Sequence, residues 1–246
     1  MKPHLLICLL GVAAGSVPAQ TSAVTPSASL VVPIPVFQKD ARILFQGDSI
    51  TDGNRGRNTD PNHILGHGYV FLIAARHGAA FPERNLTLLN RGVSGNTVIE
   101  LAQRWRQDTL DLKPDILSIL IGVNDSARGV PLDQFEQVYD KLLADARAAN
   151  PNVRFVLCAP FLLPVGGQKE NYEARSADIK QRQAIVAKLA QKYRAALVRF
   201  QPVFNEACKR APADYWIWDG IHPTYSGHQL MADEWVRTVR EFWPKP

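Results

Sequence analysis

The sequence has 246 residues, of which 46% are hydrophobic and 21% are charged. This length and composition are typical of a globular protein with a full hydrophobic core, here one α/β domain with some leader sequence. The formal net charge of +5 arises from Lys and Arg residues scattered along the chain. Because no dense basic run is present, nucleic-acid binding is disfavoured.

The chain begins with the pattern of a secretory signal. Lys2 precedes a short apolar stretch at residues 5–10, and Val17 and Ala19 stand at the usual cleavage offsets. We therefore expect a signal peptide over residues 1–19 and export to the periplasm or out of the cell. No later stretch reaches the roughly 18 apolar residues that a membrane span needs.

Residues 20–38 are rich in Ser, Thr, Ala and Pro. This composition predicts a linker with little regular structure. Neither an internal repeat nor a second linker follows, so residues 39–246 are expected to form one domain.

From Ala41 onward, apolar runs alternate with segments of helical periodicity, which is the pattern of a parallel α/β sheet. The run at 116–121 is almost entirely apolar, as expected for a central strand covered on both faces. Right-handed crossovers between such strands give a three-layer α/β/α sandwich. The predicted strands are 42–46, 86–90, 116–121, 153–158 and 196–200.

Three segments between and after these strands have helical spacing, the first behind a start signal at Pro131 and Asp133. Ser226 and Gln229 predict a capping box for the last helix. The spaced aromatic and aliphatic side chains of these helices are interpreted as core. They are Phe135, Val138, Tyr139, Leu142, Leu143, Ala146, Ile179, Val186, Leu189, Tyr193, Met231, Trp235, Val239 and Phe242.

Two cysteines remain after the predicted signal. Cys158 belongs to a predicted strand and is expected to be a small core side chain, whereas Cys208 lies in a predicted helix. Export would permit a disulfide between them, but a domain of this size does not need one. We expect both to be unpaired.

Four polar loops follow apolar runs or a short aromatic stretch, at residues 47–52, 90–97, 122–126 and 219–223. Ser49 comes directly after the first predicted strand, at the edge where α/β folds bind ligands. A hydroxyl becomes a useful nucleophile only if a base can take its proton. His222 is the candidate base, and the four loops are interpreted as one assembled active site.

Together these loops resemble the SGNH (GDSL-type) hydrolase family, named for a Ser, a Gly, an Asn and a His. The four residues fall on Ser49, Gly95, Asn124 and His222. A GDS tripeptide alone is weak evidence for this family. All four blocks in order, with a terminal DxxHP, are a specific signature of it. The resemblance runs from about residue 40 to the C-terminus.

Within the family, residues 50–57 and 66–70 and the Trp218-Asp219 pair are most similar to the acetylxylan-esterase-like branch. The family resemblance implies a flavodoxin-like sheet with strand order 2-1-3-4-5. The GxSxG elbow of α/β-hydrolases is absent, which argues against that other fold.

Ester hydrolysis by a serine needs a nucleophile, a base, an orienting acid and donors to the developing oxyanion. Ser49 is the predicted nucleophile and His222 the base. Asp219, on the same loop, would orient the imidazole. The resemblance implies that the oxyanion donors are the backbone N–H groups of Ser49 and Gly95 and the amide of Asn124. Glycine suits position 95 because a backbone that closely approaches a substrate has no room for a Cβ.

Each of these residues also has an ordinary interpretation. Ser49 and Asn124 suit local turns and caps, Gly95 suits a simple turn, and His222 suits an exposed surface. Their conjunction favours catalysis. Asp48 is expected to hold the nucleophile turn through local backbone or through Asn124.

Three side chains are predicted to contact substrate: Asp52, Arg57 and Trp218. Tryptophan faces stack against sugar rings, and Arg or Asp binds hydroxyls. Arg55 and Trp105 are weaker candidates, because a loop charge and a packed ring would serve as well. His63, His67 and His77 show no metal-binding spacing, and the inferred mechanism requires no metal or cofactor.

These features predict an exported serine esterase that removes small acyl groups, above all acetyl, from a carbohydrate such as xylan or xylo-oligosaccharides. The alternatives are a broad carboxylesterase, a thioesterase or a lysophospholipase on the same machinery, and a carbohydrate-binding protein on a decayed hydrolase fold. Intact Ser49, Asp219 and His222 disfavour the last. The sequence carries no signal for an oligomeric state.

Overall fold

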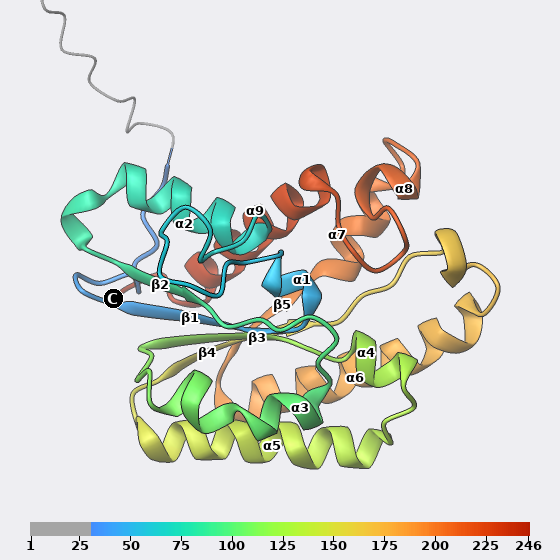
Figure 1. The fold of residues 1–246 in the computed structure, drawn as a ribbon, viewed down its shortest axis with the longest axis horizontal. Helices are drawn as coiled ribbons and strands as arrows, with labels where there is room; N and C mark the ends of the chain where they lie inside the picture. The colour runs from blue at the N-terminus through green and yellow to red at the C-terminus, as the bar shows by residue number, and fades with distance from the viewer. Residues whose placement is uncertain (1–30) are drawn as a thin grey trace, which may run out of the picture. The chain divides into compact units, whose positions relative to one another are not determined.

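A five-stranded, entirely parallel sheet lies at the centre of the computed structural model, which describes residues 31–246 (Figure 1). The strand order is β2-β1-β3-β4-β5, which confirms the order that the family resemblance implied. All five predicted strands are confirmed to within one residue at each end. Their bounds are β1 (Arg42–Gly47), β2 (Thr87–Asn90), β3 (Ile116–Leu120), β4 (Arg154–Ala159) and β5 (Ala196–Arg199).

The sheet is covered on both faces, as an all-parallel sheet requires. Every residue of β3 is buried. Along β1, Ile43 and Phe45 belong to one hydrophobic cluster and Leu44 to the other. The alternation follows from the pleat, which directs successive side chains to opposite faces.

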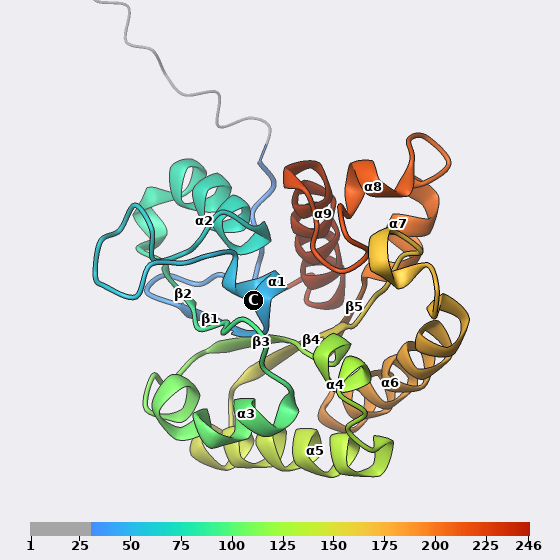
Figure 2. The same cartoon turned by 45° about the vertical axis from the view of Figure 1, so that its right-hand side comes forward.

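Helices form the two outer layers (Figures 1 and 2). One layer contains α2 (Tyr69–Ala80), α7 (Phe200–Ala207) and α9 (Tyr225–Phe242), and the other contains α3 (Val98–Gln103), α5 (Leu132–Ala149) and α6 (Tyr172–Tyr193). Shorter elements connect them. These are α1 (Ser49–Asp52), α4 (Val123–Ala127), α8 (Ala213–Trp216), η2 (Pro82–Arg84), η4 (Gly166–Gln168) and a π-helical turn, η3 (Arg106–Leu110).

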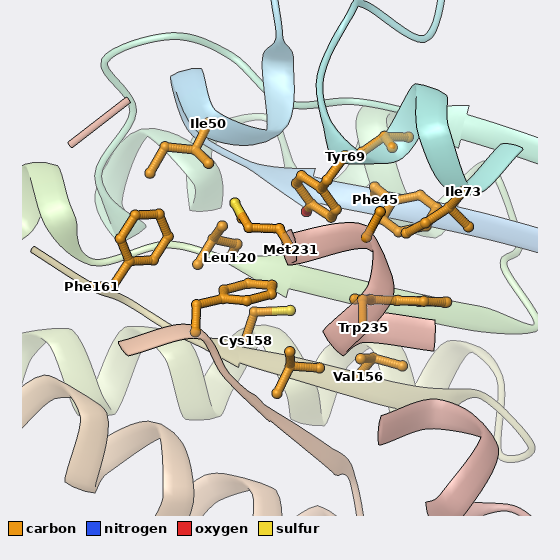
Figure 3. Close-up of a cluster of buried hydrophobic side chains, with 14 of the residues drawn as sticks. Phe45, Ile50, Tyr69, Ile73, Leu120, Val156, Cys158, Phe161, Met231 and Trp235 are labelled. Carbon is orange, nitrogen blue, oxygen red and sulfur yellow. The ribbon is translucent and has the colours of Figure 1, made fainter. Parts of the chain in front are cut away.

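The core between the sheet and α9 combines aromatic, aliphatic and sulfur-containing side chains (Figure 3). The ring of Trp235 packs 5.2 Å from that of Phe45, and its Nε1 donates to Ser118 Oγ at 3.0 Å. Cys158 lies in the same cluster, and burial raises the pKa of its thiol to about 12. Cys158 and Cys208 are both free thiols, as expected.

Two helix predictions need correction. Phe242, expected in the core, is 45% exposed at the end of α9. The predicted capping box of Ser226 and Gln229 is wrong, because α9 begins at Tyr225. Thr224 is the N-cap, and its side chain accepts the backbone N–H of Gly227 at 3.2 Å.

The domain begins earlier than residue 39. Ile34, Val36 and Phe37, inside the predicted linker, are buried in the core. Arg84 fixes this segment by donating to the backbone oxygens of Ile34 and Phe37 at 2.9 and 2.8 Å. The segment has no regular structure, but its apolar side chains dock on the domain. The predicted signal peptide and the first part of the linker lie outside the described residues.

No helix within residues 31–246 is both long enough and apolar enough to cross a membrane.

Candidate active site

Ser49 is the first residue of α1, immediately beyond β1. Asp48 caps this short helix, with its Oδ1 accepting the backbone N–H of Ile50 at 3.0 Å. Asp48 is only 1% exposed, and burial raises its pKa to about 7. The prediction that Asp48 holds the turn through local backbone is confirmed. The sequence thereby places the Ser49 hydroxyl at the carboxyl end of a central strand, where open α/β sheets bind ligands.

His222 and Asp219 reach Ser49 from a tight loop between α8 and α9. The Ser49 Oγ lies 2.8 Å from His222 Nε2, and His222 Nδ1 lies 2.6 Å from Asp219 Oδ2. Although partial burial opposes ionisation of Asp219, hydrogen bonds from the backbone and side chain of His222 hold its pKa below the usual value. A hydroxyl, an imidazole and a carboxylate are therefore hydrogen-bonded in one line.

The loop that carries His222 is closed by its own backbone. Ile217 and Pro223 form an isolated antiparallel bridge, and Trp218 N–H donates to the carbonyl of His222 at 3.2 Å. Leu163, beyond β4, donates to the Gly220 carbonyl at 3.0 Å and ties the loop to the sheet. The three-residue spacing of Asp219 and His222 thus presents both side chains to one place.

Gly95 and Asn124 come from the ends of the two neighbouring strands. Gly95 has a φ of 82°, in the region that favours glycine. Asn124 donates one hydrogen of its Nδ2 to the Asn96 carbonyl at 3.0 Å, which leaves the second hydrogen for another acceptor. Within residues 31–246, neither the Ser49 nor the Gly95 backbone N–H has a hydrogen-bond acceptor. The N–H groups of Ser49 and Gly95 and one amide hydrogen of Asn124 thus remain free to bind another acceptor.

Further contacts hold the Gly95 loop against its neighbours. Asp125, fully buried, accepts the backbone N–H of Val98 at 2.9 Å and so ties α4 to the start of α3. Gly92 packs on α1 so tightly that a Cβ there would lie 2.3 Å from the backbone nitrogen of Asp52. Asn90 donates to the Thr51 carbonyl at 2.7 Å. The ends of β1, β2 and β3 therefore form one hydrogen-bonded unit.

Asp52, predicted to contact substrate, is 2% exposed and faces inward. Its carboxylate accepts hydrogen bonds from Arg57 Nη2 at 2.7 Å, Ser94 Oγ at 2.9 Å and Ser94 N at 3.0 Å. Despite burial, the bonds from Arg57 and Ser94 lower the pKa of Asp52. This geometry corrects the prediction, because a carboxylate surrounded by protein donors supports the Gly95 loop and has no free face for a substrate.

The remaining predicted contacts differ in their exposure. The Arg57 side chain is 53% exposed and is anchored at its tip by Asp52. Trp218 is 64% exposed beside Asp219, so its ring is open to a ligand. Trp105 is 4% exposed and packs with the core. Arg55 donates its Nε to the Gly92 carbonyl at 3.0 Å, and burial lowers its pKa to about 10.

Within residues 31–246, no group of three or more His, Cys, Asp or Glu side chains is placed to hold a metal ion. His77 is buried in α2, with Nδ1 3.0 Å from the Ile73 carbonyl. His228, which the sequence analysis did not select, accepts the backbone N–H of Tyr69 at 3.2 Å. Burial lowers its pKa to about 4, so this histidine is a neutral hydrogen-bond acceptor at the start of α2.

A parallel α/β sandwich with this hydroxyl, imidazole and carboxylate at its ligand-binding edge has the groups that a serine hydrolase uses for acyl transfer. The profile of the GDSL-like Lipase/Acylhydrolase family matches residues 45–230. The chain belongs to that family.

Three relatives place the chain more closely. The acetylxylan esterase of Geobacillus stearothermophilus is 31% identical over 214 residues, which are 82% of this chain and 95% of that one, and the crystal structure of this enzyme, Axe2, matches with a TM-score of 0.73. A GDSL-like protein from Parabacteroides merdae matches with a TM-score of 0.79 and 37% identity, over 84% of this chain and 99% of that one. The thioesterase 1/protease 1/lysophospholipase L1 of Escherichia coli K12 is 28% identical over 69% of this chain and 76% of its own.

Proposed function

We propose that this protein is a serine esterase that removes acetyl groups from carbohydrate, such as acetylated xylo-oligosaccharides. The observation that carries the proposal is the line of hydrogen bonds from Ser49 Oγ through His222 to Asp219, with distances of 2.8 and 2.6 Å. These three groups match the nucleophile, base and orienting acid of acyl transfer.

In the proposed mechanism, Ser49 Oγ attacks the ester carbonyl while His222 Nε2 accepts the hydroxyl proton. Negative charge then develops on the former carbonyl oxygen. The backbone N–H groups of Ser49 and Gly95 and the free N–H of Asn124 stabilise that charge. His222 returns the proton to the departing alcohol, which leaves an acetyl group on Ser49.

Water then releases the acetyl group in a second acyl transfer, in which water is the nucleophile and Ser49 Oγ is the leaving group. His222 removes a proton from the water as its oxygen attacks the acyl carbon, and the collapse of the second tetrahedral intermediate returns the proton to Ser49 Oγ. Asp219 remains ionised throughout and keeps Nδ1 protonated. The lowered pKa of Asp219 is consistent with that role.

The carbohydrate assignment has three supports. A relative with 31% identity over most of both chains is an acetylxylan esterase. The exposed ring of Trp218 stands next to Asp219, where it offers a stacking face for a sugar. Arg57, half-exposed and held by Asp52, is a candidate donor to sugar hydroxyls.

A second candidate function is thioester or lysophospholipid hydrolysis, which the Escherichia coli relative supports. Kinetics on aryl esters of increasing chain length, acyl-CoA thioesters, lysophospholipid and acetylated xylo-oligosaccharides separate the two. A preference for acetyl esters and for xylo-oligosaccharide acetates supports the first proposal. A preference for long acyl chains would replace it with the second.

The nucleophile is tested independently. Ser49→Ala is expected to fold normally and to lose several orders of magnitude in turnover. A serine-directed phosphonate is expected to label Ser49 in the native enzyme. Label on another serine, or near-native activity in Ser49→Ala, would refute the mechanism.

We also propose that the protein is exported, on the basis of the signal-like residues 1–19. Expression of the full chain and N-terminal sequencing of the mature protein test this. A mature form that begins near Gln20 in the periplasm or medium is expected, and retention of residues 1–19 in the cytoplasm would overturn it.

A further inference from the structure

Arg104 directly follows α3, and its side chain contacts the loop that carries Gly95. Its side chain is only 16% exposed, and all three of its nitrogens donate hydrogen bonds. The acceptors are Asn96 Oδ1 (2.7 Å), the Arg91 carbonyl (2.7 Å), Gln46 Oε1 (2.8 Å), the Gly47 carbonyl (3.1 Å) and Asp108 Oδ2 (3.1 Å). One guanidinium therefore joins the end of β1 to the loop that follows β2.

Asn96 connects Arg104 to the predicted oxyanion donors. Its side-chain oxygen accepts the Arg104 Nε–H, and its backbone oxygen accepts the Asn124 amide at 3.0 Å. Gly95 is its immediate neighbour in the chain. Asn96 is thus the single residue that connects the Arg104 side chain to Gly95 and to the Asn124 amide.

The residues that accept hydrogen bonds from Arg104 are themselves held in place. Gln46 is fully buried, and its Nε2 donates to the Asp108 carbonyl and to Thr109 Oγ1, both at 2.7 Å. Asp108 and Thr109 belong to the π-helical turn η3. Such turns are rare and often occur at functional sites. Here the turn supplies the carboxylate that faces Arg104 and the acceptors that orient Gln46.

We propose that Arg104 is a positioning residue of this esterase, which holds Gly95 N–H and the Asn124 amide in place through Asn96. The inference rests on the proposed function, because it takes these two groups as oxyanion donors. Such donors act only when they are held at hydrogen-bonding distance from the developing charge, and small displacements are costly. The planar five-donor fork of arginine matches these divergent acceptors, whereas a lysine ammonium does not.

A double-mutant cycle on an aryl acetate tests the proposal. Arg104→Lys is expected to lower kcat about 10- to 100-fold, with little change in KM, because the loss appears as charge develops. In an Asn124→Ala background, the same change is expected to cost at least about 5-fold less, since coupled residues are not additive. Equal losses in the two backgrounds would overturn the proposal.

Asn96→Ala provides a second route that leaves Arg104 in place. The variant keeps the backbone acceptor of Asn124 and loses only the acceptor of Arg104 Nε. We expect kcat to fall as in Arg104→Lys, and the two changes combined to cost little more than either alone. Wild-type kcat in a folded Asn96→Ala enzyme would overturn the proposal even if Arg104→Lys failed to fold.

Arg84→Lys is the matched control. Arg84 is another partly buried arginine that holds backbone carbonyls, those of Ile34 and Phe37. Its variant is expected to shift the melting temperature without a change in kcat. Because the assay uses an aryl acetate, failure on xylo-oligosaccharides would refute only the carbohydrate assignment, and activity in Ser49→Ala would refute the proposed nucleophile.

Discussion

The carboxylate of Asp219 holds both the ring and the backbone of His222. One oxygen lies 2.6 Å from His222 Nδ1, and the other accepts the backbone N–H groups of His222 at 2.7 Å and Ile221 at 2.9 Å. The His222 ring nitrogen and the two backbone N–H groups all donate, so each of them needs a hydrogen-bond acceptor. The residue therefore fixes the loop conformation and the imidazole orientation at once.

Asp219→Asn is expected to lower kcat by about 10⁴-fold, the loss that follows when an imidazole is held in the wrong tautomer. An amide has one acceptor oxygen, so it cannot serve the ring and the two backbone N–H groups together. If its NH₂ faces Nδ1, the ring proton moves to Nε2, and His222 can no longer take the Ser49 proton. Steady-state kinetics on an aryl acetate measure the loss.

Asp214→Asn, an exposed aspartate on the nearby α8, is the control and is expected to retain full activity. Near-native rates in Asp219→Asn would mean that another group orients His222.

Asn124→Ala removes a donor that is needed most when negative charge develops. We expect kcat to fall roughly 100- to 1,000-fold, about 3–4 kcal/mol of transition-state stabilisation, with a much smaller change in KM. Asn205→Ala, at an exposed position of α7, controls for the substitution itself. A change in KM alone would exclude Asn124 from the oxyanion site.

The buried Asp48 predicts a pH effect on stability. Its pKa is about 7 in the folded protein against an ordinary value of 3.8, mainly because burial disfavours the charge. The folded state therefore holds this proton more tightly than the unfolded state, and its contribution to the free energy of unfolding is complete below about pH 4. That contribution is lost as the pH rises towards 7, by up to about 4 kcal/mol.

Asp48→Asn is expected to flatten this decline, because the amide keeps the acceptor for Ile50 N–H and cannot ionise. Urea unfolding at several pH values between 4 and 8 measures the difference from the native protein. Asp133→Asn, an exposed position at the start of α5, should leave the pH dependence unchanged. An unaltered slope in Asp48→Asn would show that Asp48 does not titrate in this range.

The sheet could be predicted from the sequence because its strands are short apolar runs between polar turns. Ile116 to Leu120 are all buried, and every one of them except Ser118 is apolar. The four loops of the site were identifiable because each contains residue types that acyl transfer requires. Parallel strands bring their carboxyl ends to one edge, so loops far apart in sequence meet there.

Other features depend on contacts that no local pattern records. Asp52 looked like a ligand-facing carboxylate until its neighbours Arg57 and Ser94 were located. Residues 34–37 have a linker-like composition, but they bury apolar side chains against the domain. Arg104 has no distinctive sequence setting, and its role follows only from acceptors contributed by three separate segments: the end of β1, the loop after β2 and η3.

Trp218→Ala tests whether the exposed ring beside Asp219 binds sugar. If the indole stacks on a xylose unit, truncation should raise KM for acetylated xylo-oligosaccharides about 10-fold or more, the order of a lost 1.4 kcal/mol contact. Hydrolysis of a small aryl acetate, which places no sugar on the ring, should change little. Phe242→Ala removes another exposed aromatic ring, 45% accessible at the far end of α9, and should affect neither substrate. Equal losses on both substrates in Trp218→Ala would instead indicate that the ring supports the Asp219–His222 loop, and would leave the carbohydrate assignment dependent on the family relationship.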